Sequence, residues 1–261
     1  MNASLLAEAA TRNFVEHASW AVRRLPGARV ELAPNLVVSD SGLAIDTVNI
    51  VCAARLREAE VADSVRRVRR LFGSRPFSWW VAPGDEPKDL GARLEAEGLS
   101  AADSELAMST DVAPAKLPGA PGDLAVRRVT RAEELSSFAA ISAANWDPPD
   151  QILADFYRRS TDALLEPGCP IRFYVAELSG EPVAGVEITL AAGVAGVYGL
   201  STMARHRRRG IGAAVLSEAL RDSLGHARGR AVLQAAEAGV GLYRRLGFVQ
   251  FGKITEYKPH P

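Results

Sequence analysis

Residues 205–216 read Arg-His-Arg-Arg-Arg-Gly-Ile-Gly-Ala-Ala-Val-Leu, and this stretch decides how the second half of the chain is interpreted. It follows an apolar, β-branched run over 194–203 and begins a helical pattern that continues to about residue 224. A strand, a basic turn and a helix in this order present free backbone N–H groups to a phosphate. Gly210 and Gly212 have no Cβ, so a ligand can approach the backbone closely. Because the arginines add positive charge at the positive end of the helix dipole, the stretch predicts an anion site.

The segments around this stretch predict a sheet with helices. Three apolar segments on short connections precede it, which indicates an antiparallel meander. In chain order, we expect a strand at 124–129, helices at 131–144 and 150–165, strands at 171–178, 183–190 and 194–203, a helix to about 224, a strand at 231–234, a helix at 239–246 and a strand at 249–257.

The first half shows a similar order of elements with weaker signals. We expect a helix at 4–23, strands at 28–32 and 44–53, a helix at 58–72, a strand at 77–81 and a helix at 88–97. The last helix ends at Gly98-Leu99 before a strand, as the helix at 239–246 ends at Gly247-Phe248. A glycine after a helix is common, but the matching order of elements favours a diverged internal duplication.

A stretch rich in proline, glycine and alanine, 112–122, is the best candidate for a linker. We therefore divide the chain into a first domain at 1–112, a linker at 113–122 and a second domain at 123–261. At 261 residues the chain is long enough for two domains of ordinary size.

The composition fits a globular protein and limits the function classes. The chain is 48% hydrophobic and 24% charged, with 31 basic and 31 acidic residues. Zero formal net charge argues against a dedicated nucleic-acid binder. Cys52 and Cys169 have no metal-ligand spacing, which favours buried thiols in a reducing compartment and no metal. Without a signal pattern or an apolar run of membrane length, we expect a cytoplasmic protein, monomeric or homodimeric, that does not enter a membrane.

The second half resembles the GNAT superfamily of acyl-CoA-dependent N-acyltransferases. Arg207-Arg-Arg-Gly210-Ile-Gly212 matches the family segment Q/R-x-x-G-x-G/A, and Leu242-Tyr-Arg-Arg-Leu-Gly-Phe248 is similar to its closing Leu-Tyr-x-x-x-Gly-Phe segment. The resemblance covers roughly residues 124–257. It implies an α+β fold with a mixed, mostly antiparallel central sheet flanked by helices. The first half looks like a degenerate copy of that fold in a tandem arrangement, and it has no glycine-rich turn between Ala53 and Phe72. We therefore expect one acyl-CoA site per chain.

The resemblance also implies where acetyl-CoA, or another acyl-CoA, would bind. Backbone amides from about Arg207 to Gly212 would hold the pyrophosphate, and either Arg205 or Arg209 would reach the 3′-phosphate. An N–H at about Thr202 or Met203 would face the thioester oxygen. The expected cofactor-binding residues are Leu200, Thr202, Met203, Arg207, Arg208, Arg209, Gly210, Ile211, Gly212 and Ala213.

Two residues are the first candidates for catalysis. Tyr243 occupies the family's tyrosine position, which implies a general acid that protonates the departing thiolate. Glu187, mid-strand in Val186-Glu-Ile-Thr-Leu190, is the first candidate for the base, although an exposed face of the strand is an equal interpretation. Glu237 is the next choice. Ala236 stands where relatives often have asparagine, so Gln234 is a candidate replacement.

The first two helices of this fold and their connection would shape the acceptor site. Trp146 is the first candidate for a lining residue, followed by Asn145, Asp147 and Phe156. A loop tryptophan can equally fill the core. In the first half, Trp79-Trp80 favours the core, although one of the two must face outward from a strand and could meet the second domain.

The leading hypothesis is therefore an N-acetyltransferase acting on a small-molecule amine. Transfer to a hydroxyl or use of a longer acyl group remains open. The alternatives are an aminoacyl-tRNA-dependent transferase, for which Arg66-Arg-Val-Arg-Arg70 could follow a phosphate backbone, and a non-catalytic acyl-CoA-binding protein.

Overall fold

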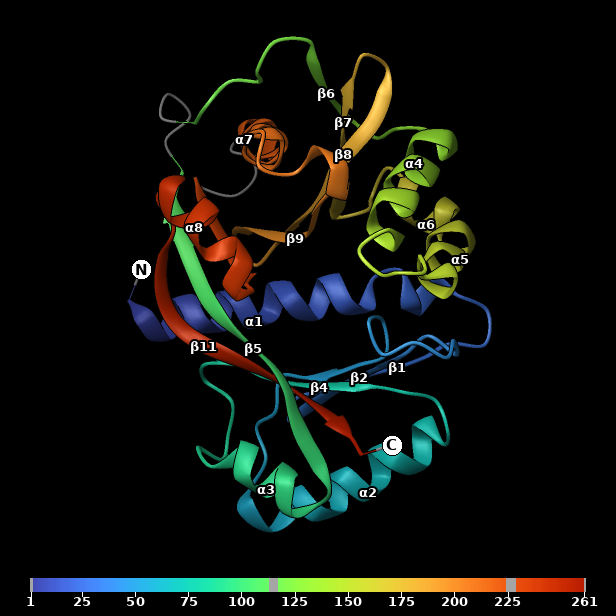
Figure 1. Cartoon of the computed structure of the whole chain (residues 1–261). Helices are drawn as coiled ribbons and strands as arrows, with labels where there is room; N and C mark the ends of the chain where they lie inside the picture. Colours follow the sequence, from blue (N-terminus) through green and yellow to red (C-terminus); the bar gives the residue numbers. More distant parts are fainter. Residues whose placement is uncertain (1, 113–116, 224–228, 261) are drawn as a thin grey trace.

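The computed structural model describes residues 2–112, 117–223 and 229–260. These ranges form an α+β structure in which helices cover one large, mostly antiparallel sheet (Figure 1). The expected fold class is confirmed. Residues 113–116 of the expected linker, and residue 224 at the expected end of a helix, lie outside the described ranges.

The first half contains one long helix, five strands and shorter helices. They are α1 (Ala3–Ser19), the 3₁₀ turn η1 (Val22–Arg24), β1 (Arg29–Ala33), β2 (Leu36–Asp40), β3 (Ile50–Cys52), η2 (Glu58–Glu60), α2 (Val61–Phe72), β4 (Ser78–Val81), α3 (Leu90–Ala96) and β5 (Leu99–Asp111).

The second half contains the meander and the helix after the arginine-rich turn. Its elements are β6 (Leu124–Arg128), α4 (Ala132–Ala143), α5 (Gln151–Arg159), α6 (Thr161–Leu165), β7 (Ile171–Leu178), β8 (Glu181–Ala191), β9 (Val194–Thr202), η4 (Ala204–His206), α7 (Ile211–Ser223), β10 (Arg230–Ala235), α8 (Glu237–Arg245) and β11 (Val249–Pro259).

The two halves share one sheet. Its strand order is β1-β2-β3-β4-β11-β5-β10-β9-β8-β7-β6. β5, from the first half, lies between β11 and β10, and β11, from the second half, lies between β4 and β5. Figure 1 shows these two strands crossing the middle of the molecule together. Each half therefore contributes a strand that pairs with strands of the other half. The expected boundary near residue 112 divides the chain into two segments, but both segments belong to one sheet.

The topology of the first half repeats in the second. In both, a helix connects two parallel strands: α2 connects β3 to β4, and α7 connects β9 to β10. The next helix then ends at a glycine with positive φ, Gly98 at 79° and Gly247 at 86°, before a central antiparallel strand. This repetition is what an internal duplication predicts.

Helix α1 connects the two halves by packing across the hairpin of β8 and β9 (Figure 1). Asn13, fully buried on α1, has its Nδ2 within hydrogen-bond distance of the carbonyl oxygens of Thr189, Ala191 and Val194, at 2.8, 3.1 and 3.2 Å. Its Oδ1 accepts a hydrogen bond from the Tyr198 hydroxyl at 2.9 Å. The helix is therefore fixed to the second half by a buried polar group whose donor and acceptor atoms are both used.

Two expectations for individual elements are wrong. The expected strand at 44–53 is reduced to Ile50–Cys52, and β2 at Leu36–Asp40 was not expected. All five residues of β2 are buried, because α1 covers one face of the strand and α2 the other, so the strand shows no polar alternation. The expected helix at 150–165 is two helices, α5 and α6, which meet at Ser160.

Candidate active site

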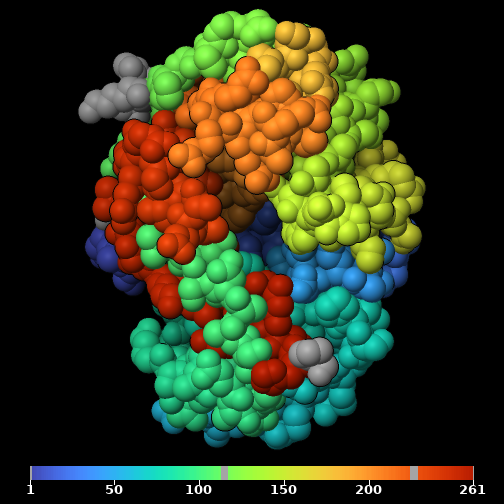
Figure 2. Space-filling model, in the orientation of Figure 1, coloured from blue at the N-terminus to red at the C-terminus, as the bar shows by residue number. Residues whose placement is uncertain are grey.

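A cleft of about 1320 Å³ lies between the two halves of the sheet. Figure 2 shows a hollow in this region, bordered by α8 in red, α7 in orange and the α4–α6 segment in yellow-green. Its walls are formed by α1, the connection from α4 to α5, β8, β9, the turn before α7, the end of β10, α8 and the central strands β5 and β11. Residues from both halves of the chain therefore line one continuous cleft.

The arginine-rich turn forms one end of this cleft. Arg208 and Gly210 have left-handed backbone conformations, with φ of 63° and 78°. Turns of this kind can gather successive N–H groups around an anion. Among the described residues, no backbone carbonyl accepts from the N–H groups of residues 208–213, which lead into the first turn of α7. The predicted anion site therefore has both of its physical components, free amides and a helix N-terminus.

The arginines of the turn have different surroundings. The Arg207 Nε donates to the Thr202 carbonyl oxygen at 2.9 Å, which fixes the turn to the end of β9. Arg207 and Arg208 line the cleft. Arg205 instead pairs with Glu181, and Arg209 Nη1 lies 3.2 Å from His206 Nδ1. Arg205 and Arg209 do not line the cleft, and a contact of either with a more distant phosphate stays a prediction.

Strands β9 and β10 separate where they reach the cleft. β10 pairs in parallel with residues 195–197 of β9 only, whereas β9 continues beside β8 as far as Thr202. The register of β9 against β8 shifts at a bulge that contains Gly199 and Leu200. The side of β9 that faces away from β8 is therefore open at residues 198–202, where an extended ligand could add to the strand.

Of the two backbone donors expected at the end of β9, Thr202 and Met203, one is already used. The Met203 N–H donates to the Val183 carbonyl oxygen at 2.9 Å, so it is not free for a ligand. Because N–H groups alternate in direction along a strand, the Thr202 N–H points away from β8 toward the open edge. The candidate donor for a developing oxyanion is therefore the Thr202 amide, and Leu200 lies at the bulge beside it.

Glu187 is a buried carboxylate at the centre of the cleft. Its side chain extends from β8 and is 5% exposed, so the alternative of a solvent-facing strand residue is wrong. The Tyr157 hydroxyl donates to Oε1 at 2.7 Å. Burial raises the pKa of Glu187 to about 7, although this hydrogen bond opposes the shift. Near neutral pH a large fraction of the carboxylate is therefore ionised, as a general base requires.

Tyr243 lines the cleft from α8 and is 9% exposed. Its ring packs edge-on against Phe248, and a Cβ at Gly239 would lie 2.9 Å from the tyrosine Cε2 atom. No described residue forms a hydrogen bond with its hydroxyl. Burial and the negative charge of Glu105 raise the pKa of Tyr243 to about 12. The hydroxyl therefore remains protonated at physiological pH and can act as a donor.

Comparison with known proteins agrees with this geometry. Residues 135–248 match the family model described as "Acetyltransferase (GNAT) family". This part of the chain belongs to the GNAT family. A comparison with curated proteins finds no match.

Solved structures share the GNAT fold along nearly the whole chain. A GCN5-related N-acetyltransferase from Kribbella flavida is 22% identical, with a TM-score of 0.70 and 96% of each chain covered. A tandem GNAT protein from the clavulanic acid biosynthesis pathway is 13% identical, with a TM-score of 0.62, 99% of this chain and 95% of that chain covered. A GCN5-related N-acetyltransferase from Sphaerobacter thermophilus is 16% identical, with a TM-score of 0.59 and coverages of 98% and 91%. At these identities the likeness establishes the fold alone.

The turn of the first half that corresponds to the GNAT anion turn has different chemistry. It connects β3 to α2 without a glycine, and acidic residues, Glu58, Glu60 and Asp63, surround the beginning of the helix. The Glu60 carboxylate accepts a hydrogen bond from the Arg57 N–H at 2.8 Å. A side-chain carboxylate therefore occupies the helix N-terminus and would repel a phosphate.

The residues expected at the acceptor site lie together around the connection from α4 to α5. Trp146 is 45% exposed and lines the cleft, so it does not fill the core. Phe156 lines the cleft but is buried against Tyr157. Asn145 donates through Nδ2 to the Ser201 hydroxyl at 2.6 Å, which joins this connection to β9. Asp147 is not among the residues that line the cleft.

Of the other residues singled out in the sequence, some line the cleft and others do not. Glu237 is exposed at the first turn of α8 and does not line the cleft, whereas Gln234 on β10 does. Trp79 is fully buried, and Trp80 lines the cleft and packs edge-on against Phe14 of α1. The outward-facing residue of the pair is therefore Trp80, whose ring packs on α1 of the first half; a side-chain contact with the second half stays a prediction.

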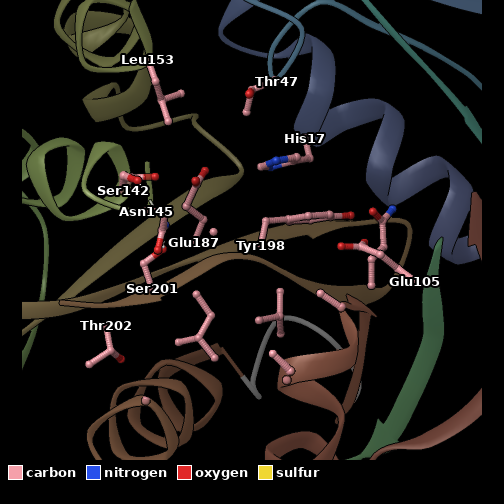
Figure 3. Close-up of a pocket in the computed structure, with 18 of the residues that line it drawn as sticks. His17, Thr47, Glu105, Ser142, Asn145, Leu153, Glu187, Tyr198, Ser201 and Thr202 are labelled. Atoms are coloured by element: carbon pink, nitrogen blue, oxygen red, sulfur yellow. Dashed lines mark hydrogen bonds between the residues drawn. The ribbon is translucent and has the colours of Figure 1, made fainter. Parts of the chain in front are cut away.

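Several residues of the cleft were not identified from the sequence as candidates for the site. His17 of α1 stacks on Tyr198 with 3.7 Å between ring centroids, and its Nδ1 lies 3.1 Å from the Thr189 hydroxyl oxygen. Burial lowers the pKa of His17 to about 3, so the ring is neutral. Glu105 reaches the cleft from β5 (Figure 3). His17 and Glu105 belong to the first half in sequence, and no local motif could connect them with this site.

Proposed function

We propose that this protein is an N-acetyltransferase that transfers an acyl group from acetyl-CoA to the amine of a small molecule. GNAT family proteins generally use acetyl-CoA. The observation that carries the proposal is the combination, in one cleft, of an anion-binding turn, an open strand edge and a buried carboxylate of raised pKa. Each of these serves a different part of the reaction.

The chain's own groups fit a CoA thioester. The free amides of residues 208–213 would hold its pyrophosphate, and the open edge of β9 would pair with the pantetheine arm. A Cβ at Gly212 would contact Thr202 Oγ1 at 3.4 Å and Leu242 Cδ2 at 3.9 Å, so a large side chain there would extend between the turn and α8. Acetyl-CoA would supply an activated acyl group, whose C–S bond is exchanged for a C–N bond to the acceptor.

Glu187 would act as the general base. An amine attacks only as its neutral form, and it must lose a proton as the new bond forms. The Glu187 Oε1 atom lies against the Tyr157 hydroxyl and close to Gly199, where a Cβ would lie 2.6 Å from it. It would accept that proton. The Thr202 amide would stabilise negative charge on the carbonyl oxygen.

Tyr243 would act as the general acid. A hydroxyl with a pKa of about 12 keeps its proton at neutral pH. It would donate a hydrogen bond, and then a proton, to the departing sulfur. The proton that Glu187 takes up and the proton that Tyr243 gives up then return through solvent, so the enzyme is unchanged after each turnover.

The tRNA-dependent alternative finds less support in α2. Three of its four arginines have local partners: Arg66 pairs with Asp63, Arg67 with Glu31, and Arg69 donates to the carbonyl oxygens of Glu97 and Gly98. Side chains used in this way are less free to follow a phosphate backbone. Steep salt dependence of tRNA binding would support that alternative over a small acceptor.

An acceptor screen tests the proposed function. Thiol release from acetyl-CoA is followed with a panel of small amines, for the native protein and for Glu187→Gln and Tyr243→Phe. We expect turnover with at least one amine and a loss of about a hundredfold in kcat for each variant, the usual size of a general acid or base effect. A non-catalytic acyl-CoA-binding protein would instead bind CoA and release no thiol with any amine.

A further inference from the structure

The cleft has charges of opposite sign at its two ends. Arg207 and Arg208 line it at the anion-binding turn. On the side formed by the first half and the central strands, the charged lining residues are Asp46, Glu105, Glu256 and Lys258. The Lys258 ammonium is already paired, at 2.9 Å from Asp46 and 3.3 Å from Glu256. This second end is therefore acidic, and its own cation is in use.

Glu105 is the carboxylate at this end without a partner. Among the described residues, no side chain forms a hydrogen bond or an ion pair with it. Burial, and to a smaller extent the negative charges of its neighbours Asp103 and Glu256, raise the pKa of Glu105 to about 7. A half-buried carboxylate beside two others is electrostatically unfavourable, and a cation placed there would relieve it.

Two other polar groups in the cleft also have unused capacity. Glu187 is 5% exposed, and of its two oxygens only Oε1 has a hydrogen-bond partner among the described residues. Tyr243 as a residue is 9% exposed, and its hydroxyl has no hydrogen-bond partner among the described residues. These two groups lie on β8 and α8, outside the acidic cluster, and point to a polar ligand in the same cleft.

Figure 3 shows how the two carboxylates are arranged. Glu187 enters from β8 and Glu105 from β5, with Tyr198 between them in this view. Tyr198 is held in place by its hydrogen bond to Asn13 and by its stacking on His17. An acceptor that reaches both carboxylates must therefore extend past a rigid aromatic side chain.

We propose that the acceptor is a diamine or polyamine, which places its reacting amine at Glu187 and a second, protonated amine at Glu105. The inference rests on the proposed function, because it assigns the acceptor class of that same cleft. The basic turn and the acidic end would keep the anionic donor and the cationic acceptor apart. The second ammonium never reacts, so its pairing with Glu105 contributes to binding and orientation rather than to chemistry.

Paired substrates test this assignment. Thiol release from acetyl-CoA is measured for α,ω-diaminoalkanes of increasing length and for the n-alkylamines of matching length, at a pH above 8, where Glu105 is ionised. We expect one range of diamine lengths to exceed the matching monoamines by about tenfold or more in kcat/KM, the effect of about 1.4 kcal/mol. Glu105→Gln is expected to bring this ratio close to one, mainly by raising KM for the diamines. Glu8→Gln, an exposed carboxylate of α1 outside the cleft, is the matched control.

A binding measurement separates this inference from the proposed function. Calorimetric titration with the best diamine, in the presence of CoA, should show binding to the native protein that Glu105→Gln weakens about tenfold. Monoamines used as well as diamines, or an unchanged ratio in Glu105→Gln, would overturn the assignment. An equal loss of kcat for both substrate types would also overturn it, because Glu105 would then act in the chemistry. Diamine binding that Glu105→Gln weakens, without any thiol release, would contradict the proposed function and support only the recognition of a diamine in this cleft.

Discussion

At the scale of single residues, the site depends on carboxylates that are held where water does not solvate them well. Glu187 is the clearest case, because its position on β8 places it in the cleft while Tyr157 supplies only one hydrogen bond. The sequence could indicate this residue only as one candidate, since a glutamate in the middle of a strand faces either solvent or the interior. Burial by α1 and α5, which are distant in sequence, decides between the two.

Glu187→Gln should therefore change how stability depends on pH. The folded-state pKa is raised from 4.5 to about 7, so the carboxyl favours folding below pH 4.5, and this contribution is lost as the pH rises through 7. Glutamine does not ionise and can still accept from Tyr157. We expect the variant to unfold with a free energy similar to that of the native protein near pH 4.5 and to be the more stable of the two above pH 7, by at most about 3 kcal/mol. Denaturant unfolding at several pH values measures this difference.

Tyr157→Phe is a useful companion variant in that experiment. Without its hydroxyl the ionised carboxylate loses a hydrogen bond, so the midpoint of the pH dependence should move to a higher pH. A stability difference between Glu187→Gln and the native protein that does not vary with pH would contradict the assigned burial and pKa.

At the scale of secondary structure, local patterns predicted most elements and the antiparallel meander of β7, β8 and β9, but not the pairing between strands far apart in sequence. The glycines and arginines around residue 210 and the Leu-Tyr-x-x-x-Gly-Phe segment are local, and the elements there were predicted closely. The sequence did not predict that β5 pairs with strands of the second half, or that β11 pairs with a strand of the first half. Pairing between strands far apart in sequence leaves no local periodicity. β2 was missed for a related reason, since both of its faces are buried by helices from elsewhere.

The contact of α1 with the hairpin of β8 and β9 should contribute measurably to stability. Asn13→Ala would leave three carbonyl groups and the Tyr198 hydroxyl without this partner in a buried region. We expect a loss of about 3 kcal/mol in the free energy of unfolding. Each buried group left without a hydrogen-bond partner costs about 1–3 kcal/mol, and the total is reduced because some of these groups will find other partners. Arg12→Ala, exposed on the same helix, should change stability by less than about 0.5 kcal/mol. Chemical denaturation compares the two, and equal effects would show that the Asn13 contacts do not fix the helix.

At the scale of the whole molecule, the chain combines two similar topologies with different roles. The second half supplies the anion-binding turn, Glu187 and Tyr243, whereas the first half supplies α1 and two of the carboxylates at the acidic end of the cleft, Asp46 and Glu105. None of the helices in the described ranges has both the length and the apolar character that crossing a bilayer requires. The asymmetry between the halves follows from two turns: one has free amides at its helix N-terminus, and the other has Glu58, Glu60 and Asp63 there.

The central claim is that one turn, at residues 207–212, binds the CoA donor. Calorimetric titration of acetyl-CoA tests it with three proteins: the native chain, Gly212→Trp, and Gly168→Trp. Gly168 is the matched control, because it is exposed, has no left-handed φ and has open space around its Cα. We predict one site per chain in the native protein, retained in Gly168→Trp and lost in Gly212→Trp while its circular dichroism spectrum stays native. Two equivalent sites per chain, or unchanged affinity in Gly212→Trp, would contradict the account.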